Sequence, residues 1–145
     1  MPRPARSELP DFGVFHVTAR GVAGCAIQAD DTDRNRFVRL LRLATTTAGW
    51  RVLAYCLMTN HFHLVLLCER DSMSRGMHAL NFRYAQAFNT RYSRRGHLFQ
   101  ERYHARAIRD DEHLAAACAY VADNPVRAGL CTARDAWPWS GGELL

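Results

Sequence analysis

The chain has 145 residues, of which 48% are hydrophobic and 23% charged, so it can form a core and is neither disordered, fibrous nor a coiled coil. We expect a single domain over residues 1–145. No segment reaches the roughly 18 uninterrupted apolar residues of a membrane helix, and the first residues lack a signal peptide's apolar stretch, so we expect a cytoplasmic protein without membrane contact. The net charge is +5 and all 19 basic residues are arginines, whose guanidinium groups suit phosphate.

The first half of the chain reads as one strand, one helix and then a pair of strands. Residues 12–20 alternate as a half-buried strand does, and aspartates then precede a helix over about 31–48 that ends at Gly49. Residues 50–57 and 61–68 form two further strands, joined by a tight connection at 58–60. This pattern predicts an antiparallel hairpin in the middle of the chain.

The second half contributes two helices and one extended segment. An apolar stripe indicates a helix over about 72–93, and residues 97–108 are extended, as a strand or a basic arm. A last helix over about 111–123 begins with acidic residues and ends at Pro125; beyond it, Trp137 and Trp139 would lie across the domain. The resulting βαββαβα order predicts an α+β fold, a ferredoxin-like antiparallel sheet with helices packed on it.

The five cysteines are odd in number, scattered and never spaced as CxxC. This argues against a disulfide framework or a zinc knuckle. We expect free, small, buried thiols in a reducing compartment.

Two histidines on the third strand are candidates for chemistry. His61 and His63 share one face of that strand, while Phe62 points to the core. Two imidazoles about 7 Å apart along a strand can converge on one divalent ion if a third ligand is supplied. Taken alone, an H-x-H pair is more often a polar strand face without function.

A second candidate lies on the last helix, where Tyr120 and Asn124 are four residues apart and therefore neighbours on one face. An asparagine oxygen is a hard ligand suited to magnesium or manganese. If this helix crosses the sheet beside the histidine strand, Asn124 completes a His-His-Asn site and Tyr120 faces it. The alternatives are a half-buried tyrosine and an ordinary residue near a helix end.

Arginines interleaved with aromatic residues concentrate between residues 83 and 109. Such a composition suits single-stranded nucleic acid, because cations contact phosphates and rings stack on bases, but a solvated basic face is an equal alternative. The cluster consists of Arg83, Arg91, Arg94, Arg95, Arg102, Arg106 and Arg109.

Several of these segments resemble a known family. Residues 55–64 (YCLMTNHFHL) resemble the histidine-hydrophobic-histidine (HUH) motif of single-tyrosine transposases. Residues 97–103 (HLFQERY) and 120–130 (YVADNPVRAGL) are similar to further blocks of the REP-associated tyrosine transposases (RAYT proteins), and Arg20-Gly21 and Trp139-Ser140 also fit. The likeness covers nearly the whole chain in several ordered blocks.

The resemblance implies a metal-dependent endonuclease and strand transferase that acts on single-stranded DNA and REP-type hairpins. Tyr120 would be the nucleophile, forming a 5′-phosphotyrosine link, and His61, His63 and Asn124 would hold Mg²⁺ or Mn²⁺. Arg20 and Arg127, which lie in two matched blocks, join the arginine cluster as candidate DNA contacts. We expect a monomer or homodimer, and the sequence leaves open whether Tyr120 serves its own histidines or those of a partner.

Two other functions remain compatible with these residues. One is a hairpin-binding regulator that descends from a transposase and does not cut DNA. The other is a rolling-circle initiator or relaxase, which shares the H-x-H chemistry but not the other blocks.

Overall fold

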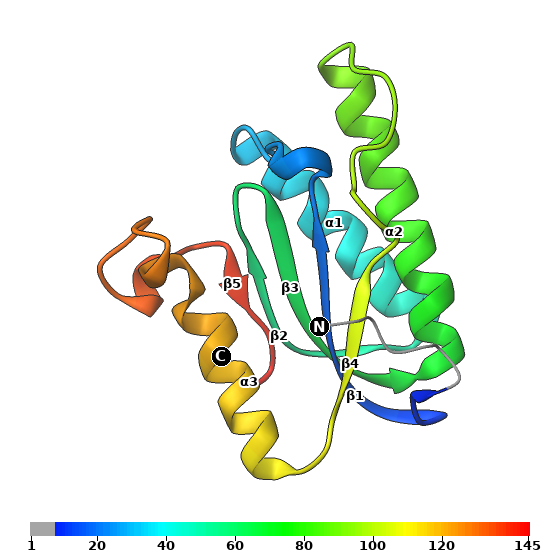
Figure 1. Ribbon diagram of the computed structural model, residues 1–145, viewed down its shortest axis with the longest axis vertical. Coiled ribbons are helices and arrows are strands. Elements are labelled where there is room, and N and C mark those ends of the chain that lie inside the picture. The colour runs from blue at the N-terminus through cyan, green and yellow to red at the C-terminus, as the bar shows by residue number, and fades with distance from the viewer. Residues whose placement is uncertain (1–7) are drawn as a thin grey trace.

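A computed structural model describes residues 8–145 and shows a five-stranded antiparallel sheet (Figure 1). The strand order is β4-β1-β3-β2-β5, and its first four positions have the ferredoxin-like order that the sequence predicts. The strands are β1 (Phe12–Arg20), β2 (Arg51–Leu57), β3 (His61–Glu69), β4 (His104–Ile108) and β5 (Ser140–Gly141).

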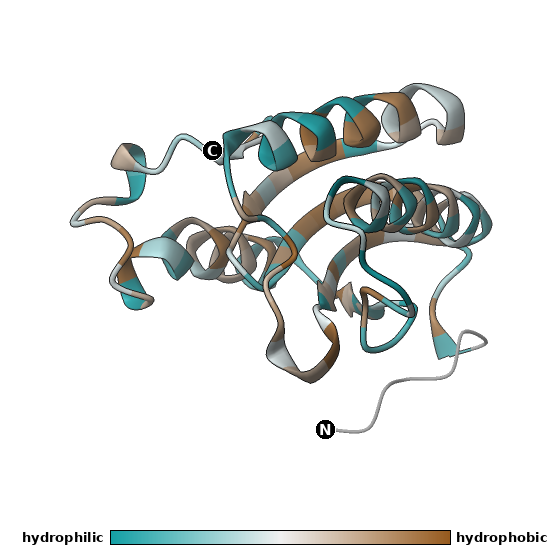
Figure 2. Cartoon of the chain, turned by 90° about the horizontal axis from the view of Figure 1, so that it is seen from above, coloured by the Kyte–Doolittle hydropathy of each residue, from teal (hydrophilic) through white to brown (hydrophobic). Residues whose placement is uncertain are grey.

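Three helices cover the two faces of this sheet. Helices α1 and α2 contribute to one apolar cluster with the sheet, and α3 contributes to another on the opposite face. In Figure 2 the strands are mostly hydrophobic, whereas the helices also carry hydrophilic residues. The helices are α1 (Asp31–Ala48), α2 (Arg70–Arg91) and α3 (Asp111–Arg127), with short 3-10 turns η2 (Val22–Gly24) and η3 (Arg134–Ala136).

Helix α1 has the bounds that the sequence predicts, and the cause lies in its two caps. The side chain of Asp30 accepts a hydrogen bond from the backbone N–H of Asp33, which satisfies one of the free donors of the first turn. Gly49 ends the helix with a φ of +70°, a left-handed conformation that glycine adopts without steric cost.

Aromatic rings fix α1 and α2 to the sheet. Phe62 of β3 is fully buried, as expected, and its ring centroid lies 4.7 Å from that of Phe37 of α1. Tyr84 of α2 lies 5.2 Å from Phe37 and donates its hydroxyl hydrogen to the backbone oxygen of Ile27. The sheet face that carries Phe62 is therefore filled by apolar side chains of α1 and α2.

Three element boundaries differ from the sequence predictions. Helix α2 begins at Arg70, directly after β3, and within residues 97–108 only His104–Ile108 form a strand. Helix α3 continues through Pro125 to Arg127 instead of stopping before the proline. A proline near a helix end removes only one hydrogen bond, and the last turn is retained because the N–H of Ala128 bonds to the oxygen of Asn124.

The C-terminal tail wraps around the β2 edge of the sheet. The indole N–H of Trp137 donates to the backbone oxygen of Leu57 at 3.1 Å, and β5 pairs with β2. The guanidinium carbon of Arg34 lies 5.9 and 6.0 Å from the ring centroids of Trp137 and Trp139. The tail therefore covers an edge of the domain, as the two tryptophans suggested.

All five cysteines are free, with Cys25 and Cys131 only half-buried. Within residues 8–145, no helix combines the length and apolar character needed to cross a bilayer.

Candidate active site

The predicted histidines lie on the sheet face that α3 covers. His63 of β3 pairs with Thr18 of β1, and His16 of β1 pairs with Val65 of β3, so His16 and His63 point to the same side. His61 shares this side because it lies two residues before His63. We call His16, His61 and His63 the histidine cluster; ring centroids of His61 and His63 are 5.0 Å apart, and those of His16 and His63 are 5.2 Å apart.

Helix α3 brings Tyr120 and Asn124 to this cluster. The amide nitrogen Nδ2 of Asn124 lies 2.7 Å from Nε2 of His63, and both side chains are buried. The Tyr120 ring centroid lies 5.7 Å from that of His63, yet 51% of the tyrosine remains exposed. The arrangement that the sequence could only suppose, a helix crossing beside the histidine strand, is therefore present within one chain.

Burial keeps the histidine cluster neutral at neutral pH. Loss of hydration lowers the pKa of His16 and of His61 to about 4 and that of His63 to about 2, from an ordinary value of 6.5. Positive charge adds to this effect, since Arg106 lowers the pKa of His16, and Arg20 and Arg127 lower that of His63. The imidazoles therefore present nitrogen lone pairs.

Arg127 contacts the tyrosine because α3 extends past its proline. Its guanidinium carbon lies 4.1 Å from the Tyr120 ring centroid, and its Nη2 donates to the backbone oxygen of Tyr120 at 2.8 Å. The seven-residue spacing, two helical turns, places both side chains on one face of α3. A helix that ended before Pro125 would not hold Arg127 in this position.

The arginines predicted to contact DNA separate into two groups. Arg20, Arg106 and Arg127 surround the histidine cluster: Arg20 pairs with His61 and Arg106 with His16 in the sheet. The other predicted arginines lie on α2 or in the segment between α2 and β4. They are Arg83, Arg91, Arg94, Arg95 and Arg102, whereas Arg109 of the predicted cluster lies directly after β4 and belongs to neither group.

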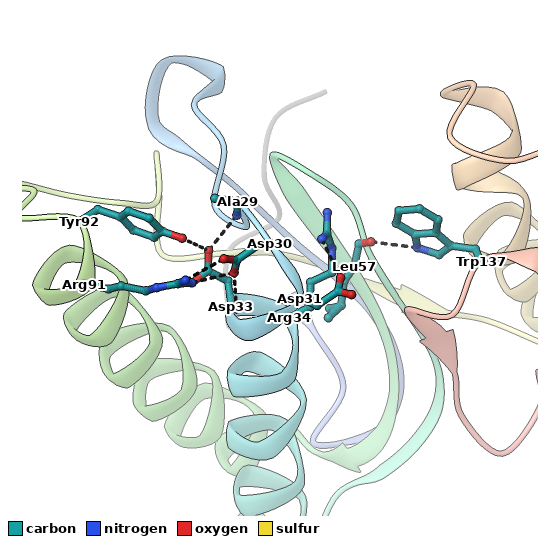
Figure 3. Close-up of polar contacts among 9 residues, drawn as sticks. All are labelled: Ala29, Asp30, Asp31, Asp33, Arg34, Leu57, Arg91, Tyr92 and Trp137. Carbon is teal, nitrogen blue, oxygen red and sulfur yellow. Dashed lines mark hydrogen bonds and ion pairs between the residues drawn. The ribbon is translucent and has the colours of Figure 1, made fainter.

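Two arginines of the second group hold parts of the protein together. Arg91 forms ion pairs of 2.7 Å with Asp30 and with Asp33, and Tyr92 donates its hydroxyl hydrogen to Asp33 (Figure 3). We call these four residues the aspartate clamp. Arg94 donates to the side chain of Asn89 and to the backbone oxygen of His97.

The donor set at the site fits a divalent cation. Asn60 Oδ1 can only accept, so the Nδ1 of His61 that lies 2.7 Å from it carries the proton and its Nε2 keeps a lone pair. Rotating the Asn124 amide by half a turn would direct its oxygen, instead of its nitrogen, to the His63 side. Two imidazole nitrogens and one amide oxygen are the groups that would hold such a cation. Within residues 8–145 no group of three or more His, Cys, Asp or Glu side chains could hold a metal, so this mixed set is the candidate.

His16 was not among the predicted site residues. No second histidine stands at ligand spacing on its own strand, so the spacing of histidines gives no signal for it. The alternation of residues 12–20 does place His16 and Thr18 on one face, but only the β1–β3 register brings that face to His63.

Comparisons with known proteins agree with this fold. The chain aligns with a structure of a REP-associated tyrosine transposase bound to a REP hairpin at a TM-score of 0.78 and 17% identity, covering 97% of this chain and 82% of the other. A candidate transposase from Deinococcus radiodurans aligns at a TM-score of 0.55 and 17% identity, covering 83% of this chain and 95% of the other. No protein of curated function matches by sequence. The sequence profile of the family described as Transposase IS200 like matches residues 26–124. The chain therefore belongs to the IS200-like transposase family.

Proposed function

We propose that this chain cuts and rejoins single-stranded DNA beside a hairpin through a covalent bond to Tyr120. The observation that supports this most is the convergence of Tyr120, Asn124 and His63 from two elements onto one partly open position. A nucleophile must be reachable by its substrate, and Tyr120 is half exposed whereas Asn124 and His63 are buried.

In the proposed reaction, the Tyr120 hydroxyl loses its proton and its oxygen attacks a DNA phosphorus. The bond between phosphorus and the 3′ oxygen breaks, which leaves a 5′-phosphotyrosine and a free 3′-hydroxyl. Attack by another 3′-hydroxyl on this linkage forms a new phosphodiester and releases the tyrosine. The bond energy is retained in the protein–DNA link, so no ATP is needed.

Each surrounding residue has a part in this reaction. The guanidinium of Arg127 lies over the Tyr120 ring, where its positive charge favours the negative charge that develops on the phenol oxygen. Arg20 and Arg106 lie beside the histidines and can contact the phosphates next to the cut. His61, His63 and Asn124 would hold Mg²⁺ or Mn²⁺, which supplies Lewis-acid polarisation of a phosphate oxygen.

The proposed substrate is a DNA hairpin with a single-stranded flank. The similar transposase structure is bound to a REP hairpin, and the fold aligns over 97% of this chain. The chain has a net charge of +5, and Arg20, Arg106 and Arg127 surround the site. Both features are compatible with binding a polyanion such as DNA. Because the whole site lies in one chain, we propose that Tyr120 serves its own histidines.

A covalent-adduct assay tests this proposal. The protein is incubated with a labelled strand that carries a REP-type hairpin and a single-stranded flank, with Mn²⁺ or Mg²⁺, and the products are resolved on a denaturing gel. We expect a protein–DNA species with the intact protein and none with Tyr120→Phe, while the half-buried Tyr55 of β2 provides the control variant Tyr55→Phe. An adduct that persists in Tyr120→Phe would contradict the proposal.

The same assay separates this activity from that of a regulator that binds hairpins without cutting. Retardation of the hairpin on a native gel, together with no adduct for the intact protein under either metal, would favour the regulator. Cleavage without any covalent species would instead indicate that water, not Tyr120, attacks the phosphorus.

A further inference from the structure

His16 contacts the histidine at the centre of the site. Its Nε2 lies 3.0 Å from Nδ1 of His63, across from β1 to β3. The His16 ring also lies 6.3 Å, centroid to centroid, from that of Tyr120 in an edge-on arrangement. The reaction described above gives this half-buried ring no part.

The contacts of His63 determine which of its nitrogens carries the proton. In the amide orientation of this structure the nitrogen of Asn124, which can only donate, faces Nε2 of His63, so this Nε2 accepts its hydrogen and has the lone pair. A neutral imidazole has one proton, which must then lie on Nδ1 and be donated to Nε2 of His16. The two hydrogen bonds therefore have the same direction: Asn124 donates to His63, and His63 donates to His16.

We propose that His16 is a positioning residue that fixes the tautomer and the ring orientation of His63, so that the Nε2 lone pair of His63 points at the site. Without an acceptor at Nδ1, the His63 proton can move to Nε2, and a proton there occupies the position that a cation needs. Outer hydrogen-bond partners of metal-binding histidines commonly have this effect. That the Nε2 lone pair matters for holding a cation rests on the proposed function. That His16 fixes the tautomer of His63 does not rest on it.

Two substitutions at this position separate the hydrogen bond from packing. His16→Phe keeps a ring of similar size between His63 and Tyr120 but removes the acceptor. His16→Gln loses the ring and keeps an oxygen that can accept from Nδ1 of His63. A role in packing alone would favour the phenylalanine, whereas the proposed role favours the glutamine.

The direct test is nitrogen-15 NMR of the imidazole side chains in the full chain at neutral pH, without metal or DNA. We expect His63 to be protonated on Nδ1 in the unaltered protein and in His16→Gln, and to shift toward protonation on Nε2 in His16→Phe. Titration with Mn²⁺ alone should then give an affinity about 10–100-fold lower for His16→Phe and close to the original for His16→Gln.

The outcomes distinguish this inference from the proposed function. A proton on Nε2 of His63 in the unaltered protein would overturn the role of His16, and this measurement needs no variant to fold. An unchanged tautomer in a folded His16→Phe protein would overturn it as well. If the unaltered protein did not bind Mn²⁺ at all, the proposed cation site would fail, while the tautomer measurements would still decide the role of His16.

Discussion

Replacing Asp33 of the aspartate clamp should destabilise the protein markedly. The carboxylate is only 3% exposed and accepts hydrogen bonds from the N–H of Ala29 at 2.8 Å, from Arg91 at 2.7 Å and from Tyr92 at 2.7 Å (Figure 3). Removing one partner of a fully buried ion pair costs about 3–5 kcal/mol. The Arg91 side chain is 31% exposed, so water and Asp30 can compensate part of the loss. We therefore expect Asp33→Ala to lower the free energy of unfolding by about 2 kcal/mol.

Urea unfolding followed by circular dichroism measures this effect, and a thermal melt should show a decrease of about 4–8 °C in Tm for a chain of this size. The matched control is Asp31→Ala, since Asp31 is 74% exposed and pairs with Arg34 on the surface. We expect a change below about 0.5 kcal/mol for the control. If the two variants lost the same stability, the aspartate clamp would contribute no more to folding than a surface ion pair.

Three further predictions concern the site. Asn124→Ala should abolish the covalent protein–DNA adduct, and adduct formation at the original rate would contradict the proposed role of Asn124. The same variant should lower the free energy of unfolding in urea by about 1–3 kcal/mol, because the buried His63 nitrogen loses its hydrogen-bond partner. Hairpin affinity should fall with rising salt, and Arg106→Gln should reduce the slope of log affinity against log salt concentration by about one. The control variant Arg42→Gln on α1 should leave this slope unchanged. Equal slopes for Arg106→Gln and the unaltered protein would exclude a phosphate contact by Arg106. The histidine cluster has lowered pKa values, so below pH 6.5 the unfolded chain binds more protons, and the free energy of unfolding should decrease from pH 6.5 toward pH 4. A His63→Gln variant should show a shallower decrease, and a flat profile for the intact protein would refute the argument.

The order of strands and helices could be predicted because each element has its own periodicity. Alternation marks residues 12–20 as a strand, and an apolar stripe from Met73 to Phe88 marks a helix. A ferredoxin-like fold is the simplest arrangement that buries the apolar face of the strands against the apolar stripes of the helices. Strand β5 has only two residues, Ser140–Gly141, too few to show any period. Its pairing with β2 depends on where the tail is held by Trp137 and Trp139.

The number of arginines in a segment predicts its charge but not what the charge contacts. Arg91 lies in the dense basic segment, yet its partners Asp30 and Asp33 are about 60 residues away in sequence. Arg106, in contrast, faces the histidines because β4 pairs with β1 in one particular register. A shift of one residue in that register would turn Arg106 to the opposite face, so local composition alone could not distinguish the two arginines.

Two contacts of the site depend on features that local sequence rules did not predict: that of His16 with His63, and that of Arg127, predicted only as a DNA contact, with Tyr120. His16 reaches His63 diagonally across a strand pair, and the contact exists only in the register that aligns Thr18 with His63. Arg127 reaches Tyr120 because α3 accepts a proline in its last turn, where the preference of proline for ending helices predicts a stop. Tertiary packing overrides the local rule in α3, because the apolar contacts of Cys118 and Val121 with the sheet hold this helix, and Arg127 lies at its end. A variant that loosened this packing should therefore weaken the contact of Asn124 on α3 with His63 before it disturbed the contact of His16 with His63, because the continuous β1–β3 ladder holds the two histidines.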